Sequence, residues 1–375
     1  MITCLFSDVI ESPIYRAIVN RLVESDLELN FGLVSSGASP FSDWLEEQGT
    51  SVKRIEVQGR IDLPRAWGSL TAMLRRDRPD VLACFGQSAT LLGFTSSIGP
   101  KAPLRTYARY HSTTHRVERN RRGVAYDRLC NRLADVIVAP NGNVARALVD
   151  DEGVDPDQIV TIPFGIRLAD FAEPTEDRID TVRRTHQIDS DRTTIGMISR
   201  LIEIKGWRYV LDPLRDRLLT DPGLQLVIAN AVGEFEPEIR QAFGSVSDQV
   251  IFIRHEPDNA ALFHTFDIFV HVPITPTVEA FGLVYIEALA AGIPSVITKS
   301  GIANDLAVDG KNCLVVPHRD SKAIGRAIDR LLGSAALRST LSAAAIASVQ
   351  TFEIEPMAEA YVELLRRLDG AHQTR

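Results

Sequence analysis

The stretch Glu279-Ala-Phe-Gly-Leu-Val-Tyr-Ile-Glu287, continued by Ala-Leu-Ala-Ala-Gly-Ile-Pro-Ser-Val-Ile-Thr298, places two carboxylates around the start of a helix. The run that begins at Leu283 consists of helix-forming residues and stops at Gly292, and a proline follows two residues later. The stretch therefore predicts a helix that leads into a strand of an α/β fold. One carboxylate precedes the helix, and the other lies inside it.

The start of this helix has the features of a phosphate-binding site. Gly282 lets the backbone approach a bound group closely, and helix N–H groups point outward near Phe281 to Val284. From Leu283 to Glu287 the helix rises roughly 6 Å, about the span from a diphosphate to the ribose of a nucleotide. Glu287 is thus placed to accept hydrogen bonds from ribose hydroxyls, unless it is an ordinary surface carboxylate. Glu279 would face the far, sugar end of such a ligand.

Short β-rich runs alternate with helical segments, such as 14–24 and 63–76, along the whole chain. The first half contains runs at residues 2–6, 29–34, 52–57, 81–85, 104–110, 136–139 and 159–162. A second series follows the polar stretch 170–192, with runs at residues 194–199, 226–230, 250–253, 268–272, 295–298 and 313–316. This alternation predicts an α/β fold of two parallel, doubly wound sheets, with the polar stretch as the linker between them.

Four segments of the C-terminal half resemble the retaining glycosyltransferases of family 4. The hallmark of that family is Glu-x7-Glu with a Gly-Leu helix and Ala-Gly-x-Pro before the next strand, as in residues 279–294. Residues 196–206 read Gly-Met-Ile-Ser-Arg-Leu-Ile-Glu-Ile-Lys-Gly, similar to the family's Gly-Arg-Leu-x-x-x-Lys-Gly motif. Residues 267–273 and 309–317 fall where the family has its corresponding segments. A lone Glu-x7-Glu is a weak signal, but four motifs in family order are not expected by chance.

The resemblance implies the GT-B architecture, in which two Rossmann-like domains face each other across a cleft. Residues 1–168, completed by a C-terminal crossover helix within 353–375, would form the acceptor domain, and residues 169–352 the donor domain. We place the crossover helix at residues 355–368. The implied activity is transfer of a sugar from a nucleoside diphosphate sugar to a glycan, lipid-linked or small-molecule acceptor, as in polysaccharide biosynthesis.

The departing nucleoside diphosphate builds up negative charge, which the protein must stabilise. Arg200 and Lys205 follow the predicted strand 194–199, and a forked guanidinium with an ammonium suits two phosphates, unless both are ordinary surface cations. The Asp-x-Asp sequences at residues 155–157 and 189–191 lie in polar turns rather than after a strand. We therefore predict a transferase without a metal ion or other cofactor. The resemblance makes Glu279 a ligand of the sugar or of its anomeric centre.

In the resembled family the first domain supplies the acceptor site and a histidine near the anomeric carbon. His111 comes just after the predicted strand 104–110, and His115 is its rival for the catalytic role. Arg109 and Ser7 are further candidates for acceptor or sugar contacts. Many relatives have a Gly-Gly loop after the first strand, whereas this chain reads Ser7-Asp-Val-Ile-Glu-Ser-Pro-Ile14. The acceptor geometry is therefore expected to differ.

The segment 105–132 contains eight arginines and two acidic residues, in a chain of net charge -8. It is either a solvated helix face or a contact surface for anionic lipid head groups or a phosphorylated acceptor. The net negative charge argues against a general nucleic-acid binder.

The chain of 375 residues, 45% of them hydrophobic, is long enough for two packed domains. Asp8 and Glu11 interrupt the first apolar run, and no apolar span of 18 residues occurs, so we expect a cytoplasmic protein with at most peripheral contact to the inner membrane face. Its four cysteines lie far apart, which predicts buried reduced thiols.

Three functions from different classes remain at this stage. The first is the retaining transferase, and the lack of a second well-placed carboxylate favours front-face attack over a double displacement. The second is a non-catalytic nucleotide-sugar-binding or partner subunit, which the altered first loop favours. The third, a nicotinamide dehydrogenase, is poor because no Gly-x-Gly-x-x-Gly follows a predicted strand. The resemblance implies that the loops 230–233 and 254–256 surround the base, and neither loop identifies that base.

Overall fold

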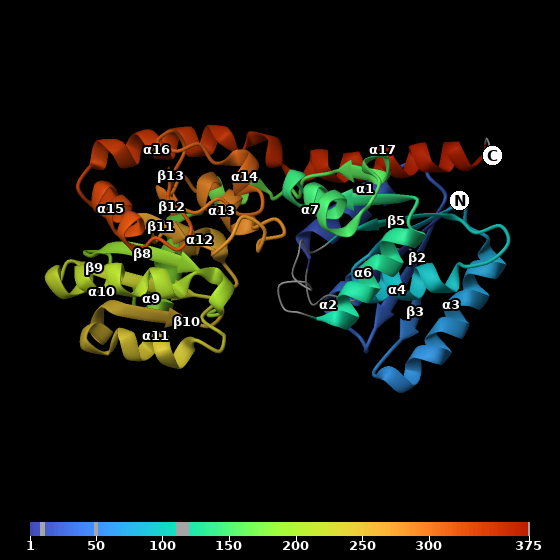
Figure 1. Ribbon diagram of the computed structural model, residues 1–375, viewed down its shortest axis with the longest axis horizontal. Coiled ribbons are helices and arrows are strands. Elements are labelled where there is room, and N and C mark those ends of the chain that lie inside the picture. The colour runs from blue at the N-terminus through green and yellow to red at the C-terminus, as the bar shows by residue number, and fades with distance from the viewer. Residues whose placement is uncertain (8–11, 49–51, 110–119, 374–375) are drawn as a thin grey trace. The chain divides into compact units, whose positions relative to one another are not determined.

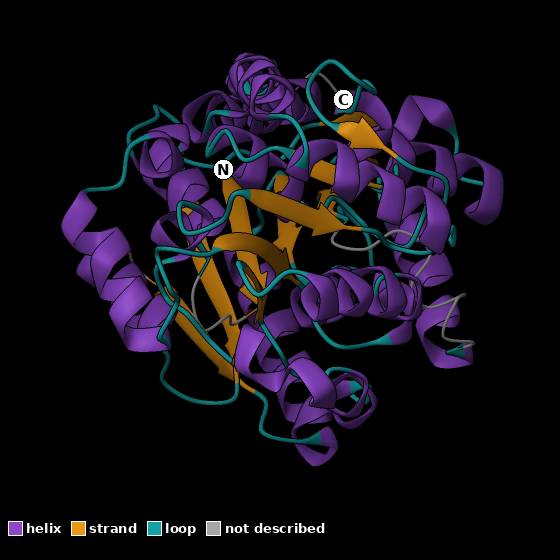
Figure 2. Cartoon of the chain, turned by 90° about the vertical axis from the view of Figure 1, so that its left-hand side faces the viewer, coloured by secondary structure: helices purple, strands orange, loops and turns teal. Residues whose placement is uncertain are grey.

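The computed structural model describes residues 1–7, 12–48, 52–109 and 120–373, which form two α/β units (Figure 1). Unit 1 comprises Met1–Gly165 and Ile354–Arg375, and unit 2 comprises Ile166–Glu353. The predicted division after residue 168 lies close to the observed one. Each unit contains one parallel sheet, and Figure 2 shows the strands in orange among the purple helices. The predicted fold class, two doubly wound Rossmann-like units, is confirmed.

Unit 1 contains a parallel sheet of seven strands in the order β3-β2-β1-β4-β5-β6-β7. The strands are β1 (Ile2–Ser7), β2 (Leu29–Ser35), β3 (Val52–Glu56), β4 (Val81–Phe85), β5 (Leu104–Ala108), β6 (Val136–Ala139) and β7 (Ile159–Thr161). All seven were predicted, with ends that differ by at most two residues.

The helices of unit 1 form two layers because side chains of a strand alternate between its faces. In β1, Ile2, Cys4 and Phe6 pack in one core and Leu5 in the other. The first layer holds α1 (Pro13–Val23), α2 (Pro40–Glu47) and α17 (Ile354–Gln373). The second layer holds α3 (Leu63–Asp77), α4 (Gln87–Ser96), α6 (Arg121–Leu133) and α7 (Gly142–Glu152). The C-terminal helix thus belongs to the core of unit 1.

Unit 2 contains a parallel sheet of six strands in the order β10-β9-β8-β11-β12-β13. The strands are β8 (Thr193–Ile198), β9 (Leu224–Ala229), β10 (Val250–Ile253), β11 (Ile268–His271), β12 (Ser295–Ile297) and β13 (Leu314–Val315). After β8 the chain continues to β9 on one side, and after β11 it continues to β12 on the other. The loops after β8 and β11 therefore diverge, and such a switch point is where open α/β sheets bind ligands.

Two helix layers also cover the sheet of unit 2. One layer consists of α8 (Leu168–Ala172), α9 (Glu176–His186), α12 (Asn259–Phe263) and α13 (Leu283–Ala290). The other consists of α10 (Leu211–Thr220), α11 (Glu236–Ala242), α15 (Ser321–Leu332) and α16 (Ala335–Ser348). The short helix α14 spans Ala303–Leu306, and 3-10 turns lie at Arg60–Asp62, Pro156–Gln158, Glu203–Lys205, Trp207–Tyr209, Gly244–Gln249 and Gln350–Phe352.

The polar stretch 170–192 is not a linker, and that prediction was wrong. It contains α9, which packs on unit 2 through the buried residues Ile179 and Val182. These two positions, three residues apart, are the helix's only large apolar side chains. They lie on one face of the helix, and a stripe this narrow is easily mistaken for a solvated segment.

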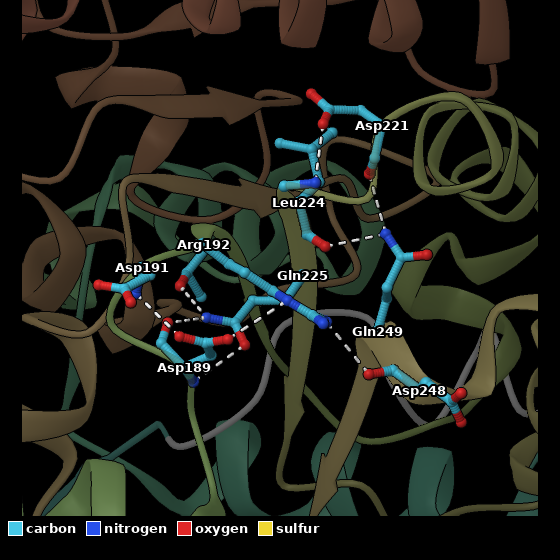
Figure 3. Close-up of polar contacts among 10 residues, drawn as sticks. Asp189, Asp191, Arg192, Asp221, Leu224, Gln225, Asp248 and Gln249 are labelled. Atoms are coloured by element: carbon cyan, nitrogen blue, oxygen red, sulfur yellow. Dashed lines mark hydrogen bonds and ion pairs between the residues drawn. The ribbon is translucent and has the colours of Figure 1, made fainter.

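A polar network closes the N-terminal edge of the second sheet (Figure 3). The amide of Gln225 donates from Nε2 to the Asp189 carbonyl at 2.5 Å and accepts from the Asp189 N–H at 3.1 Å. The Asp189 carboxylate accepts from the Asp191 N–H at 2.9 Å, and Gln249 donates to the carbonyls of Asp221 and Leu224. The Asp-x-Asp of residues 189–191 thus forms a turn that caps the edge opposite the strand C-termini.

Among the residues that the structure describes, no single helix is both long and apolar enough to cross a membrane. The strongly bent pair α15 and α16 meets the length and composition criteria only when the two helices are taken together.

Candidate functional site

The loops after β8 and β11 meet at the switch point of the second sheet. Lys205 ends the 3-10 turn that follows β8, and Glu279 lies in the loop between β11 and α13. Gly206 has a φ of 81°, and a Cβ atom there would lie 1.9 Å from the carbonyl oxygen of Val272. Only glycine permits this approach of the two loops. The backbone contact therefore brings Lys205 to Glu279 across 74 residues of sequence.

Two donors converge on one oxygen of Glu279. Its Oε1 lies 2.5 Å from the Lys205 ammonium and 2.9 Å from Nε2 of His271. Glu279 is 8% exposed. Burial alone would raise the pKa of this carboxyl, but the hydrogen bond from His271 and the charge of Lys205 outweigh burial and hold the pKa at about 2. Glu279 is thus a fixed anion at neutral pH.

The loop after β12 holds the backbone around Glu279 through hydrogen bonds. The Oγ atom of Ser300 accepts a hydrogen bond from the Glu279 N–H at 3.1 Å, and Ile302 donates its N–H to the Phe281 carbonyl at 2.7 Å. Gly301 has a φ of 57°, and a Cβ atom there would lie 2.4 Å from the Phe281 carbonyl oxygen and 2.8 Å from Cβ of Glu279. The backbone around Glu279 is therefore held by the loop after β12, while Lys205 and His271 contact its carboxylate.

Helix α13 begins at the same place without a side-chain cap. Its N-cap is Gly282, in the left-handed conformation with a φ of 83°. The first N–H groups of a helix have no acceptor within the helix and attract anions. Leu283 and Val284 are half-buried, and Phe281 is 3% exposed, so in this stretch the backbone is the part suited to a polar ligand. The predicted start of α13 at Gly282 is present in the structure, and its anion-binding role stays a prediction.

Glu287 lies in the second turn of α13 and is half-buried. Burial raises the pKa of its carboxyl to about 7. Within the described ranges the carboxylate has neither a hydrogen bond nor an ion pair. A half-buried carboxylate without a partner is costly, and hydroxyl donors of a ligand would satisfy it.

Arg200 lies close in sequence but does not join the cluster. The residue is exposed, and its backbone carbonyl accepts the indole N–H of the buried Trp207 at 3.0 Å. Its guanidinium has no partner among the residues described. The backbone at Arg200 is therefore fixed, while the cation points to solvent and is available to an anion.

The predicted site residues of unit 1 include two histidines and Ser7. His111 and His115 lie outside the described residues. Ser7 accepts the N–H of Ala89 at 3.0 Å through its Oγ, so it caps the start of α4, and its contact with an acceptor or sugar stays a prediction. Residues 8–11, which follow Ser7, also lie outside the described residues.

Arg109 does not have the surface position that a contact to an acceptor or sugar requires. Its side chain is 2% exposed, and its guanidinium lies 2.6 Å from Glu152 and 3.3 Å from Asp127. Both carboxylates are buried, and Asn131 donates to the second oxygen of Glu152 at 2.6 Å. The expected substrate contact is therefore replaced by a structural role, because sequence alone did not show the two carboxylates that bury this cation.

Sequence analysis missed His271, Ser300 and Gly301. His271 closes a run of buried strand residues, Ile268–His271, where a polar side chain is unusual and indicates a partner. Ser-Gly after β12 is an ordinary turn signal. The loops expected to surround a base are partly engaged as well, since Glu256 lies 2.6 Å from Nε2 of His186.

Comparison with known proteins places two family descriptions on the chain. Residues 178–348 match "Glycosyl transferases group 1", and residues 36–170 match "Glycosyltransferase Family 4". The first match contains Arg200, Lys205, Glu279 and Glu287.

Individual relatives are more distant. D-inositol 3-phosphate glycosyltransferase of Acidothermus cellulolyticus is 30% identical over 244 residues, which are 62% of this chain and 53% of that protein. The capsular polysaccharide biosynthesis glycosyltransferase CapM of Staphylococcus aureus is 22% identical over 276 residues, 72% of this chain and 71% of that protein. The chain thus spans about half the length of the first relative.

The crystal structure of Anabaena HepE in complex with UDP resembles the whole chain, with a TM-score of 0.79 and 18% identity. The similarity covers 98% of this chain and 100% of that one. At this identity the likeness concerns the fold.

Proposed function

The chain belongs to the glycosyltransferases of the group 1 and family 4 type, with the GT-B fold, and on that premise we propose that it transfers a sugar from a nucleoside diphosphate donor with retention of the anomeric configuration. One observation carries the proposal. At the switch point of unit 2, Lys205 and Glu279 meet beside the uncapped start of α13. Glu287, whose carboxylate has no partner among the described residues, lies one turn further along that helix. This arrangement suits a diphosphate with a sugar on one side and a ribose on the other.

Charge stabilisation of the leaving group is assigned to protein cations and backbone dipoles. The Lys205 ammonium, the exposed Arg200 guanidinium and the first N–H groups of α13 all carry positive charge or its partial equivalent. In the ranges that the structure describes, no three His, Cys, Asp or Glu side chains gather as metal ligands. We propose that these groups make a divalent cation unnecessary.

Retention is proposed to proceed by front-face attack. The bond from the anomeric carbon to the phosphate oxygen breaks, the acceptor oxygen bonds to the same face, and the leaving phosphate takes the acceptor proton. A double displacement would need a free carboxylate nucleophile. Glu279 suits this less well, because Lys205 and His271 already engage one of its oxygens, and a sugar hydroxyl is the more natural partner for the rest of the carboxylate.

The donor class is supported by fold relatives, since HepE has been crystallised with UDP and with UDP and glucose. For the acceptor we propose a glycan, lipid-linked or small molecule, reached by unit 1. Helix α6 exposes four arginines while its other face is buried, which suits peripheral contact with an anionic membrane at the inner face. The exposed arginines are Arg121, Arg122, Arg128 and Arg132.

A screen of nucleotide sugars tests the donor proposal. Thermal unfolding of the full chain with UDP and GDP sugars should show one donor that raises the unfolding temperature, and incubation of that donor with candidate acceptors should give a product with the donor's anomeric configuration. Turnover should persist in excess EDTA. Activity lost on chelation and restored by Mn²⁺ or Mg²⁺ would refute the metal-independent part, and binding without transfer across a broad acceptor panel would favour a non-catalytic nucleotide-sugar-binding subunit.

The membrane proposal has its own test. The full chain should co-sediment with phosphatidylglycerol vesicles at low salt and less with phosphatidylcholine vesicles, and replacing the four α6 arginines by glutamine should abolish the difference. A control with four glutamines in place of arginines of unit 2 helices should retain it; the control positions are Arg183, Arg184, Arg326 and Arg330. Equal loss in both variants would contradict a specific role for α6.

A further inference from the structure

The geometry points to His271 as the residue that positions Glu279 for sugar transfer. It is a positioning residue and not a catalytic one, because it is 2% exposed and acts through the carboxylate that it contacts. The expected effect of His271 on the transfer rate rests on the proposed function. The contact between His271 and Glu279 rests on the structure alone.

An aromatic frame fixes the imidazole of His271 at the end of β11. The ring of Phe269 stacks on it at 6.2 Å with an interplanar angle of 10°, and the ring of Tyr285 meets it edge-on at 4.9 Å. The Tyr285 hydroxyl donates to the Thr298 carbonyl at 3.1 Å, so the second ring is itself anchored. The imidazole therefore has little freedom to turn away from Glu279.

The hydrogen bond between His271 and Glu279 has a defined direction. Burial lowers the pKa of His271, although the neighbouring carboxylate raises it in part. The imidazole is then neutral at pH 7 and carries one N–H. An ionised carboxylate only accepts hydrogen bonds, so the proton is on Nε2, which lies 2.9 Å from Oε1 of Glu279. A neutral donor holds the carboxylate without adding a second cation beside Lys205.

The neutral hydrogen-bond donor His271 matters because the Lys205 ammonium has two proposed partners, Glu279 and a donor phosphate. In the described structure it pairs with Glu279 at 2.5 Å, and in the proposed donor complex it must also serve a phosphate. If Lys205 moves toward the phosphate, Glu279 loses its cation while still buried, which is strongly unfavourable for an unsupported carboxylate. The His271 bond remains in place during this exchange. It therefore keeps Glu279 in register with the sugar when the leaving group is bound.

The same frame connects Glu279 to the start of α13. A Cβ atom on Gly282 would lie 2.7 Å from the ring of Tyr285, so the absence of a side chain at this position makes room for the ring that packs on His271. The ring of Tyr285 thus packs both on His271, which contacts the Glu279 carboxylate, and on Gly282 at the helix start. Since small displacements of a reacting group cost large factors in rate, loss of the imidazole should appear in turnover.

Two substitutions separate the hydrogen bond from the bulk of the ring. We expect His271→Phe, which removes the donor, to lower kcat about ten- to hundredfold, while Kd for the free UDP or GDP changes by less than about threefold. His271→Gln keeps an N–H donor and should restore most of kcat. His264→Phe is the matched control, because His264 is a partly buried histidine of the same unit whose Nε2 lies 2.6 Å from the Phe171 carbonyl, and it should leave kcat near that of the wild type. A folded His271→Phe variant with normal kcat, or equal losses with Phe and Gln, would overturn the proposal.

A second measurement does not depend on activity. NMR titration of the His271 ring should show a lower pKa in Glu279→Gln than in the wild type, because the charge of Glu279 raises the pKa of His271 in the intact pair. An unchanged titration would show that the two groups do not interact and would end the proposal. If the wild type binds UDP or GDP but transfers no sugar, the proposed function fails, and this titration still decides whether the pair exists.

Discussion

Glu279 and Glu287 are separated by seven residues and have opposite electrostatic settings. Burial disfavours the charge on both, but only Glu279 has compensation from Lys205 and His271. The pKa of Glu279 is therefore about 2, whereas that of Glu287 is about 7. The charge of Glu279 is compensated within the protein, whereas no described residue compensates the carboxylate of Glu287.

The first prediction concerns that missing partner. Glu287→Ala should weaken the binding of UDP or GDP by about tenfold or more, because the ribose hydroxyls lose their acceptor while alanine keeps the helix. Isothermal calorimetry measures the change, and Glu238→Ala, an exposed glutamate on α11, is the control. Unchanged affinity in the Glu287 variant would remove this residue from the nucleotide site.

The second prediction follows from the raised pKa of Glu287. A carboxyl whose pKa is raised in the folded protein binds its proton more tightly there than in the unfolded chain, whose value is about 4.3. Its stabilising contribution is complete below that value and is lost as the pH rises through about 7. The ligand-free wild type should therefore lose stability relative to Glu287→Gln between about pH 5 and pH 8.

Thermal unfolding of both proteins across this range, without nucleotide, measures the difference. Curves that run parallel at all pH values would show that Glu287 titrates at its ordinary pKa and is better solvated than its position on α13 indicates.

At the scale of elements, Arg109 joins three parts of unit 1. It follows β5, and its guanidinium contacts Asp127 on α6 and Glu152 on α7. Among the described residues, two buried carboxylates lie beside this cation, Asn131 donates to Glu152, and Arg109 donates to Tyr107. The network therefore ties the end of β5 to α6 and α7.

The third prediction tests this structural role. Arg109→Met keeps much of the side-chain volume but removes a buried cation that lies beside two buried carboxylates, so the free energy of unfolding should fall by about 3–5 kcal/mol. Urea denaturation provides the value. Arg128→Met, on the exposed side of α6, should change stability by less than about 0.5 kcal/mol. A stable Arg109 variant with impaired acceptor use would instead restore the substrate contact that the sequence had indicated.

At the scale of the whole molecule, the proposed reaction divides its tasks between the two units. In this proposal the nucleotide binds to unit 2, and the histidine proposed near the anomeric carbon, His111, belongs to the sequence range of unit 1. The fourth prediction is that His111→Ala lowers the transfer rate by at least about tenfold and leaves nucleotide affinity nearly intact, as expected for a contact made mainly in the transition state.

Steady-state kinetics and calorimetry on the same variant separate the two quantities. His115→Ala is the companion variant. If it shows the larger loss in rate while His111→Ala turns over normally, the catalytic role moves to His115.

Local sequence patterns were sufficient to predict the strands and the start of α13. Most strands are short, largely apolar runs, although β3 carries Lys53, Arg54 and Glu56. The helix start depends on neighbouring residues such as Gly282 and Leu283, so these signals do not require knowledge of distant contacts. Helix α9 was not predicted, because its apolar stripe consists of Ile179 and Val182 alone. Only its packing within unit 2 distinguishes it from a linker.

The sequence by itself determined the fold class, the two parallel sheets and the motif positions of Lys205, Glu279 and Glu287, because periodicity and turn chemistry act over a few neighbouring residues. Only the tertiary structure decided which side chains share an environment. Lys205, His271 and Glu279 meet because β8 and β11 are neighbours in the sheet and Gly206 lets their loops touch. Arg109 is buried because α6 and α7 bring two carboxylates to the end of β5. Such contacts depend on strand order and helix packing, which join residues far apart in the chain.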